Sequence, residues 1–109
     1  MAASASPKRG EVYLVNLDKP RPAIILSVDA LNRHALDVCV VPITTKMHAA
    51  FTVRVPLKKG EGGLKYDCWA KCDQVTTLDK VDLQARPLGS LSIAKLRQVE
   101  DQVRIALGL

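Results

Sequence analysis

The sequence predicts a small, mainly β domain that curves strongly into a barrel and ends in one α-helix. Short apolar segments bounded by proline, glycine or aspartate recur between residues 12 and 75, as they do in successive short strands. From Ser92 onward the apolar residues recur at helical spacing instead. A chain of 109 residues forms one domain around one core. Five or six strands and a helix in so short a chain indicate a tightly curved sheet.

The first three strands are expected at residues 12–17, 22–26 and 36–43. Asp18-Lys19-Pro20 is a turn signal between the first two, and Pro22 opens the second strand, where its missing N–H costs least. Residues 23–26 are apolar in succession, as in a strand covered on both faces. Residues 29–35 predict a polar connection.

The fourth and fifth strands are expected at residues 51–55 and 67–75. Between them Lys58–Gly63 predicts a flexible, glycine-rich hairpin tip that matches no phosphate-binding fingerprint. Along the fifth strand the small residues Cys68, Ala70 and Cys72 alternate with Trp69 and Lys71, and either face fits a covered one.

The rest of the chain predicts a connection and a terminal helix. Residues 78–88 are expected to form a short connection with one helical turn and an edge strand. Ser92 is a suitable N-cap, and Gly108 is a suitable stop. Between them the apolar positions Leu96, Val99, Val103 and Ala106 lie on one face of a helix.

Composition limits the possible partners. The net charge of +5 favours a polyanionic partner, although a basic surface that only confers solubility fits equally well. The longest apolar run, residues 23–26, is too short to span a membrane. Residues 1–7 lack the basic and apolar regions of a signal peptide, which predicts a disordered tail and a cytoplasmic protein.

No cofactor or metal site is predicted. Three cysteines are an odd number, so no disulfide framework is implied. Cys68 and Cys72 would lie about 13 Å apart along a strand, beyond the reach of a shared metal ion. With only His34 and His48 as further soft ligands, a zinc site is not expected, and small buried side chains explain these cysteines better.

Five segments in this order resemble the MazF/PemK family, the ribosome-independent endoribonuclease toxins of bacterial type II toxin–antitoxin modules. They are Arg9-Gly10-Glu11-Val12-Tyr13, Arg21–Ser27, Val41–Thr45, Asp67–Gln74 and Leu88–Ser92. The resemblance implies one toxin domain at residues 8–109, an SH3-like barrel of the CcdB/MazF/PemK type, and a homodimer. It also implies an antitoxin partner (MazE-like) with an acidic, disordered segment.

By motif position, Arg21 and Thr44 match the catalytic arginine and threonine of that family. RNA supplies its own nucleophile in the 2′-hydroxyl, so a guanidinium and a hydroxyl that hold the phosphate meet much of the chemical need. From the residues alone, a surface arginine and a turn-capping threonine explain the pattern better. The resemblance favours catalysis. His34 and His48 are left outside the catalytic set, because a lone loop histidine is more often exposed to solvent.

RNA binding is expected at residues that flank this pair. Lys19, Thr45 and Lys46 are expected to contact phosphates. Gln74 matches a glutamine that the family places near the RNA, with a barrel-end glutamine that caps backbone groups as the alternative. Many members carry a long insertion with a Gly-Ser-Glu-Gln stretch between the first two strands. Here only Asp18-Lys19-Pro20 stands in its place.

The favoured function is a toxin that is a metal-independent, sequence-specific endoribonuclease of single-stranded RNA. Its products would carry a 2′,3′-cyclic phosphate and a 5′-hydroxyl. One alternative is a non-hydrolytic toxin like CcdB, which acts by binding a protein such as DNA gyrase. Another is a nucleic-acid-binding barrel that has lost catalysis. Arg21 together with Thr44 favours the nuclease, because a pure binder does not need that pair.

Overall fold

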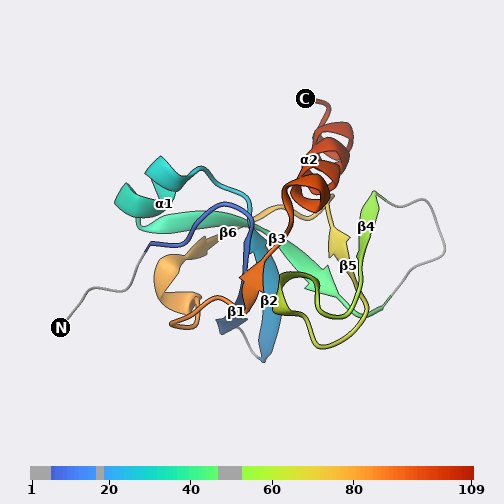
Figure 1. The fold of residues 1–109 in the computed structure, drawn as a ribbon. Helices are drawn as coiled ribbons and strands as arrows, with labels where there is room; N and C mark the ends of the chain where they lie inside the picture. The colour runs from blue at the N-terminus through green and yellow to red at the C-terminus, as the bar shows by residue number, and fades with distance from the viewer. Residues whose placement is uncertain (1–5, 17–18, 47–52) are drawn as a thin grey trace.

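The computed structural model of the protein describes residues 6–16, 19–46 and 53–109. In this part of the chain the strands are β1 (Glu11–Asn16), β2 (Pro20–Ile25), β3 (Asp37–Thr44), β4 (Arg54–Leu57), β5 (Cys68–Lys71), β6 (Thr76–Asp79) and β7 (Gly89–Ser90). The helices are α1 (Asp29–His34) and α2 (Ile93–Leu107), with 3-10 turns η1 (Glu61–Gly63) and η2 (Lys80–Asp82). Figure 1 shows a mainly β molecule with a terminal helix, which confirms the predicted class.

The sheet is antiparallel and runs in the order β4-β5-β3-β2-β1-β7, with β6 paired to β3 outside this path. Its long strand β3 has three partners. Residues 37–40 pair with β6, residues 40–42 with β2, and residues 43–44 with β5. Figure 1 accordingly places α1 and β6 at one end of the molecule, and β4 and β5 at the other. The end of β3 therefore lies between β2 and β5.

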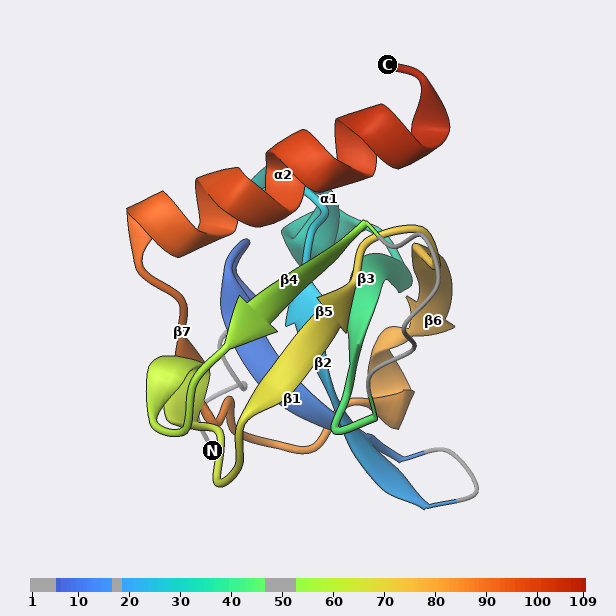
Figure 2. The ribbon, with the colours of Figure 1, turned by 90° about the vertical axis from the view of Figure 1, so that its right-hand side faces the viewer.

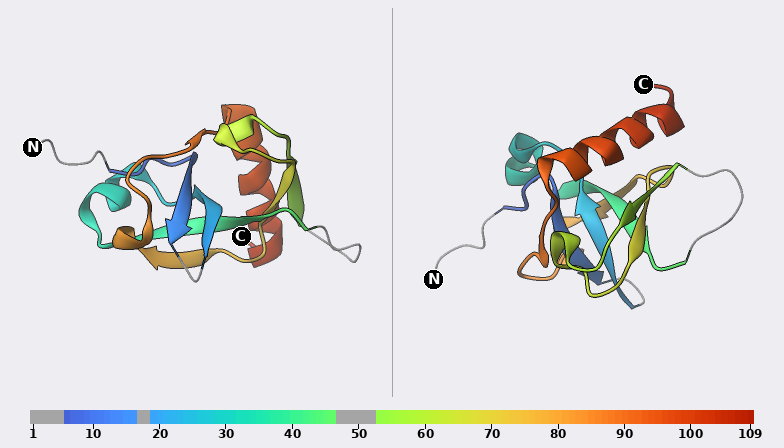
Figure 3. Two further views of the ribbon diagram at one scale, coloured as in Figure 1. Left: turned by 90° about the horizontal axis from the view of Figure 1, so that it is seen from below. Right: turned by 45° about the vertical axis from the view of Figure 1, so that its right-hand side comes forward.

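The main core lies inside the curve of the sheet. Val12, Ile24 and Val41 from the central strands meet Val99 and Val103 of α2, and all five are buried. Figures 2 and 3 show α2 lying across the open side of the sheet, next to β4. At the other edge η1 packs against β7. The sheet is thus a half-barrel whose opening is covered by a helix.

A second apolar cluster covers the outer face of the central strands. It consists of the buried residues Tyr13, Val15, Ala23, Ile25, Val38 and Val40, with Leu78 and Leu83 packed against them. On β2, Ala23, Ile24 and Ile25 are all buried, because odd and even residues face different clusters. The prediction that this strand is covered on both faces is confirmed.

The polar connection predicted for residues 29–35 is mostly exposed and does link β2 to β3, but it forms a helix, α1, that was not predicted. The buried polar residue of this helix, Asn32, has its hydrogen-bonding groups satisfied. Asn32 is fully buried and its amide nitrogen donates to the Ser27 carbonyl at 2.9 Å, while the Ser27 hydroxyl donates to Asn32 Oδ1 at 2.5 Å. Lys80 Nζ donates to the Asn32 carbonyl at 2.8 Å and ties η2 to this helix.

The fifth strand is shorter than predicted. β5 ends at Lys71, because the chain turns there and the Gln74 amide donates to the Lys71 carbonyl at 3.0 Å. The buried face is the one with Cys68, Ala70 and Cys72, which confirms both cysteines as small buried residues. Trp69 and Lys71 lie on the opposite, half-buried face. The predicted fourth strand begins at residues 51–52, outside the described residues, and β4 extends to Leu57.

The glycine-rich segment between β4 and β5 is only partly an exposed tip: residues 58–60 and Gly63 are exposed, but η1 packs against the molecule. Gly62 is buried, and a Cβ there would lie 2.7 Å from Val12 Cγ2. A Cβ on Gly63 would lie 2.1 Å from the Leu88 carbonyl oxygen, so glycine is needed for the chain to approach this closely. The predicted hairpin loop is confirmed, because β4 and β5 pair as a hairpin, and its second half packs closely as η1.

The C-terminal predictions largely hold. The predicted helical turn is η2, and the edge strand lies earlier than expected, as β6. The Ser92 hydroxyl accepts from the Lys95 amide at 3.1 Å, and Gly108 adopts a left-handed conformation, so both caps of α2 are confirmed. No described helix is long and apolar enough to cross a membrane. The predicted 1–7 tail falls mostly outside the described residues, although Pro7 is buried.

Candidate functional site

Arg21 and Thr44 are brought together by the pairing of β2 with β3. In that pairing Ala23 lies opposite Pro42. Arg21 is two residues back along β2, and Thr44 is two residues further along β3. Because side chains alternate along a strand, Arg21 and Thr44 both lie on the outer face of the sheet. In Figure 2 the start of β2 and the end of β3 lie next to each other at the lower edge of the sheet.

Both residues line one cavity of about 310 Å³, called here the Arg21–Thr44 cavity. Its lining comprises Lys19, Pro20, Arg21, Pro22, Ile43, Thr44, Thr45, Lys46 and Cys68. Three of the described lining residues carry a positive charge and none carries a carboxylate. Lys19, Thr45 and Lys46, predicted from sequence to contact RNA, thus share the cavity with the predicted catalytic pair. A phosphate group suits this lining, because cations and hydroxyl donors are its usual partners.

The Thr44 hydroxyl is oriented by the backbone. The Lys46 amide donates to Thr44 Oγ1 at 3.1 Å, so the hydroxyl oxygen already has a donor and its own hydrogen can be given to another acceptor. Thr44 is half-buried, whereas Arg21 is exposed at the mouth of the cavity. The geometry suits a fixed hydroxyl donor beside a guanidinium that reaches the ligand from solvent.

Comparisons with known proteins identify the family. A family model described as the PemK-like, MazF-like toxin of type II toxin–antitoxin systems matches residues 8–107. The chain belongs to this family. The endoribonuclease MazF9 of Mycobacterium tuberculosis is 30% identical over 94% of this chain and 97% of its own length.

Solved structures of the family agree. A mycobacterial endoribonuclease in complex with its cognate antitoxin has a TM-score of 0.83 and 30% identity, over 95% of this chain and 97% of that one. The M. tuberculosis toxin MazF-mt6 has a TM-score of 0.80 and 28% identity, over 91% of this chain and 97% of that one. The predicted class, a MazF-type endoribonuclease toxin, is confirmed, and a non-hydrolytic CcdB-like action is not favoured.

Gln74 is not brought to the Arg21–Thr44 cavity of this MazF-like toxin. It is exposed in the turn after β5, where its carbonyl accepts a hydrogen bond from the Thr76 hydroxyl at 2.8 Å. His34 is exposed on α1, away from the cavity lining, and His48 lies outside the described residues. The assignment of Gln74 to RNA binding stays a prediction.

A neighbouring cavity of about 220 Å³, the Arg21–Lys71 cavity, was missed by sequence reasoning. It is lined by Val15, Arg21, Pro22, Ala23, Val40, Pro42, Ile43, Lys71, Thr76 and Leu78. Arg21, Pro22 and Ile43 belong to both cavities. One signal for Lys71 was present in the sequence: once the small residues of the fifth strand are assigned to the core, Lys71 must face outward.

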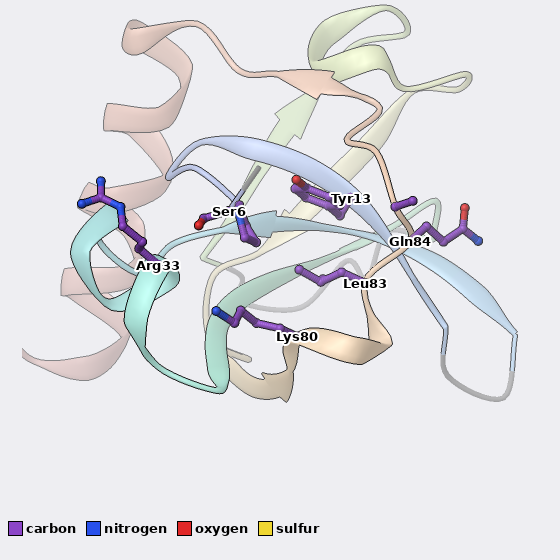
Figure 4. Close-up of a pocket in the computed structure, with 8 residues that line it drawn as sticks. Ser6, Tyr13, Arg33, Lys80, Leu83 and Gln84 are labelled. Atoms are coloured by element: carbon purple, nitrogen blue, oxygen red, sulfur yellow. The ribbon is translucent and has the colours of Figure 1, made fainter. Parts of the chain in front are cut away.

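A third cavity, of about 380 Å³, contains none of the predicted site residues. Figure 4 shows the lining residues, which come from β1, α1, η2 and the loop after η2 and include Tyr13, Arg33 and Lys80. Burial, followed by the nearby charge of Glu11, raises the pKa of Tyr13 above its ordinary value. Tyr13 therefore stays protonated at neutral pH and is not a base.

The described residues include no cluster of three or more histidine, cysteine or acidic side chains placed to hold a metal ion. Burial, followed by the charge of Asp73, raises the pKa of the Cys72 thiol to about 11, and burial likewise raises that of Cys68. Both thiols are protonated at neutral pH and are poor nucleophiles or metal ligands. The cations and hydroxyls that line the Arg21–Thr44 cavity are the groups there that suit a phosphate.

Proposed function

We propose that this chain is the toxin of a type II toxin–antitoxin module and cuts single-stranded RNA in the cytoplasm without a metal ion. The 2′-oxygen of the substrate gives up its proton to water and attacks the adjacent phosphorus, and the 5′-oxygen of the next nucleotide leaves and takes up a proton. The products carry a 2′,3′-cyclic phosphate and a 5′-hydroxyl. The observation that carries the proposal is that Arg21 and Thr44, from neighbouring strands, line one cavity rich in cations.

Each lining residue has a role that its chemistry allows. The Arg21 guanidinium stabilises the charge that develops on the equatorial oxygens, and the oriented Thr44 hydroxyl donates to one of them. Lys19, Thr45 and Lys46 hold the neighbouring phosphates. Arginine is a weak proton donor, so transfer of a proton from Arg21 to the leaving 5′-oxygen is a secondary role.

The same cations suit an acidic partner. We propose that the disordered, acidic segment of a cognate antitoxin occupies the Arg21–Thr44 cavity and excludes RNA by charge complementarity. A mycobacterial endoribonuclease of 30% identity was solved with its cognate antitoxin, which supports a partner of this kind. A homodimer is proposed with it, because a short half-barrel gains stability when a second copy covers apolar surface.

The experiment is a cleavage assay on a long single-stranded RNA in excess EDTA. We expect cuts at a short recurring sequence, with cyclic phosphate ends that T4 polynucleotide kinase removes. Arg86→Ala is the matched control for later arginine variants, because Arg86 is exposed and lines none of the three cavities described above. Cleavage that disappears with EDTA and returns with magnesium or zinc would refute the metal-independent mechanism.

A further inference from the structure

The Arg21–Lys71 cavity is small, about 220 Å³, and combines an apolar lining with three polar side chains. Val15, Ala23 and Val40 form its apolar floor, and each is no more than 4% exposed. Its mouth carries three polar side chains, from Arg21, Lys71 and Thr76. A ligand that fits it must be compact, apolar on its faces and polar along one edge.

The polar groups at the mouth include both a donor and an acceptor. Thr76 Oγ1 gives its hydrogen to the Gln74 carbonyl at 2.8 Å, so its lone pairs are left to accept a hydrogen bond from a ligand. The Lys71 ammonium supplies donors only. A planar ring whose edge offers an N–H and a carbonyl or ring-nitrogen acceptor satisfies both, and nucleobases have such edges.

The position of the Arg21–Lys71 cavity limits the choice of ligand further. Arg21 stands in the wall between this cavity and the Arg21–Thr44 cavity, and Pro22 and Ile43 also belong to both. A nucleotide joins its base to its phosphate through one ribose. Two cavities that share a wall are therefore spaced for the two ends of one nucleotide: the phosphate lies against Arg21 and Thr44, and the base lies against Arg21 and Lys71.

We propose that the Arg21–Lys71 cavity binds the base of one nucleotide that adjoins the scissile phosphate, and that it sets the base preference at that position. This inference rests on the proposed function, because it takes the phosphate to lie in the Arg21–Thr44 cavity. Insertion of the base unstacks it from its neighbours, which single-stranded RNA permits at little cost. Arg21 then couples recognition to cleavage, since one side chain borders both ligand groups.

The test uses two variants and a matched control. Leu78→Phe fills the cavity from β6, and Lys71→Met removes the donor at its mouth while keeping the length of the side chain. Thr77→Phe is the control, because Thr77 lies next to Leu78 on β6, points to the other face and does not line the cavity. Circular dichroism melting of each variant separates a folding defect from a binding defect.

Binding is measured on short RNAs centred on the mapped cut site, with a 2′-deoxy sugar that prevents cleavage. Each base beside the scissile phosphate is removed in turn to give an abasic site. We expect one abasic site to weaken binding to the unmodified protein and to Thr77→Phe by about tenfold or more, as loss of a stacked base does. In Leu78→Phe the same abasic site should change binding less than twofold. Lys71→Met should cut with a relaxed base preference at that position alone.

The outcomes separate the two proposals. If the protein cuts RNA but a folded Leu78→Phe responds to every abasic site as the unmodified protein does, the base pocket is refuted and the nuclease stands. An unchanged cut-site preference in a folded Lys71→Met refutes the role of Lys71 in base selection. If the unmodified protein cuts no RNA, the proposed function fails and this inference fails with it.

Discussion

Thr44, the last residue of β3, is the cross-strand partner of Trp69 on β5. Residues directly opposite each other in an antiparallel pair have Cα atoms about 4.5–5.5 Å apart and side chains on one face. The only tryptophan of the chain thus lies beside the proposed catalytic hydroxyl, half-buried on the outer face of the sheet. The proposed site therefore has its own spectroscopic reporter.

The first prediction follows from this pair. RNA bound in the Arg21–Thr44 cavity should change the intensity or the wavelength of Trp69 emission, because it alters the polarity around the indole. Titration with a non-cleavable 2′-deoxy analogue of the cut site measures this without turnover. Trp69→Phe is the blank, since it removes the signal and keeps an aromatic ring. Saturated binding by filter retention with unaltered emission would place the RNA elsewhere.

The second prediction concerns catalysis. Arg21→Ala should lower the cleavage rate by about 100- to 1,000-fold, as the loss of one donor to a developing oxyanion does. Its melting temperature should stay near that of Arg86→Ala, because Arg21 is exposed and outside the core. Single-turnover cleavage rates provide the measurement. Cleavage by Arg21→Ala at the rate of Arg86→Ala would remove Arg21 from the mechanism.

The third prediction separates the Thr44 hydroxyl from the Thr44 methyl group. Thr44→Val keeps the shape and loses the hydroxyl that the Lys46 amide orients, so we expect a clear loss of rate, smaller than that of Arg21→Ala. Thr44→Ser keeps the hydroxyl and should retain most of the activity. Equal rates for Thr44→Val and Thr44→Ser would show that the hydroxyl gives no hydrogen bond in the transition state.

The fourth prediction concerns packing at η1. Gly63 and Gly60 both have positive φ, but a Cβ on Gly63 meets the Leu88 carbonyl at 2.1 Å, whereas one on Gly60 meets nothing within 4 Å. Gly60→Ala should cost about 1 kcal/mol of backbone strain. Gly63→Ala should cost a further 1–3 kcal/mol or so from overpacking. Urea unfolding of both variants measures the difference, and equal stabilities would contradict the close approach of η1 to β7.

The fifth prediction concerns alkaline stability. Burial, with a smaller contribution from Asp73, raises the Cys72 pKa from 9.0 to about 11. The unfolded chain then loses this proton at lower pH than the folded chain, so the free energy of unfolding falls as the pH rises from about 9 through 11. Urea midpoints across this interval provide the measurement, with Cys72→Ala expected to show a shallower fall. A Cys72→Ala slope equal to that of the unmodified protein would assign the fall to other groups, such as Tyr13, whose pKa is also raised.

Several local features were predictable because neighbouring residues decide them. The Ser92 cap, the helical spacing up to Val103 and the Gly108 stop lie within one segment and fix α2. The short apolar runs predicted the first three strands to within two residues, whereas the fifth strand was predicted four residues too long at its end. The helix α1 was not predicted. Asn32 looks like a loop residue in sequence, yet it is fully buried: its side chain bonds to Ser27, and its backbone carbonyl accepts from Lys80 Nζ, which lies 48 residues further along the chain.

For the functional site, the sequence by itself determined the family, the curved β architecture and the identity of Arg21 and Thr44 as the candidate pair. These features are carried by motifs and by the short-range periodicity of side chains, which a strand shows whichever partner it pairs with. Tertiary structure alone decided that the long strand β3 pairs with β2, β5 and β6 in turn. That pairing places Lys71, Thr76 and Leu78 around Arg21 and leaves Gln74 outside the Arg21–Thr44 cavity. The periodicity of a strand tells which side chains share a face, but it contains no information about which strand lies alongside.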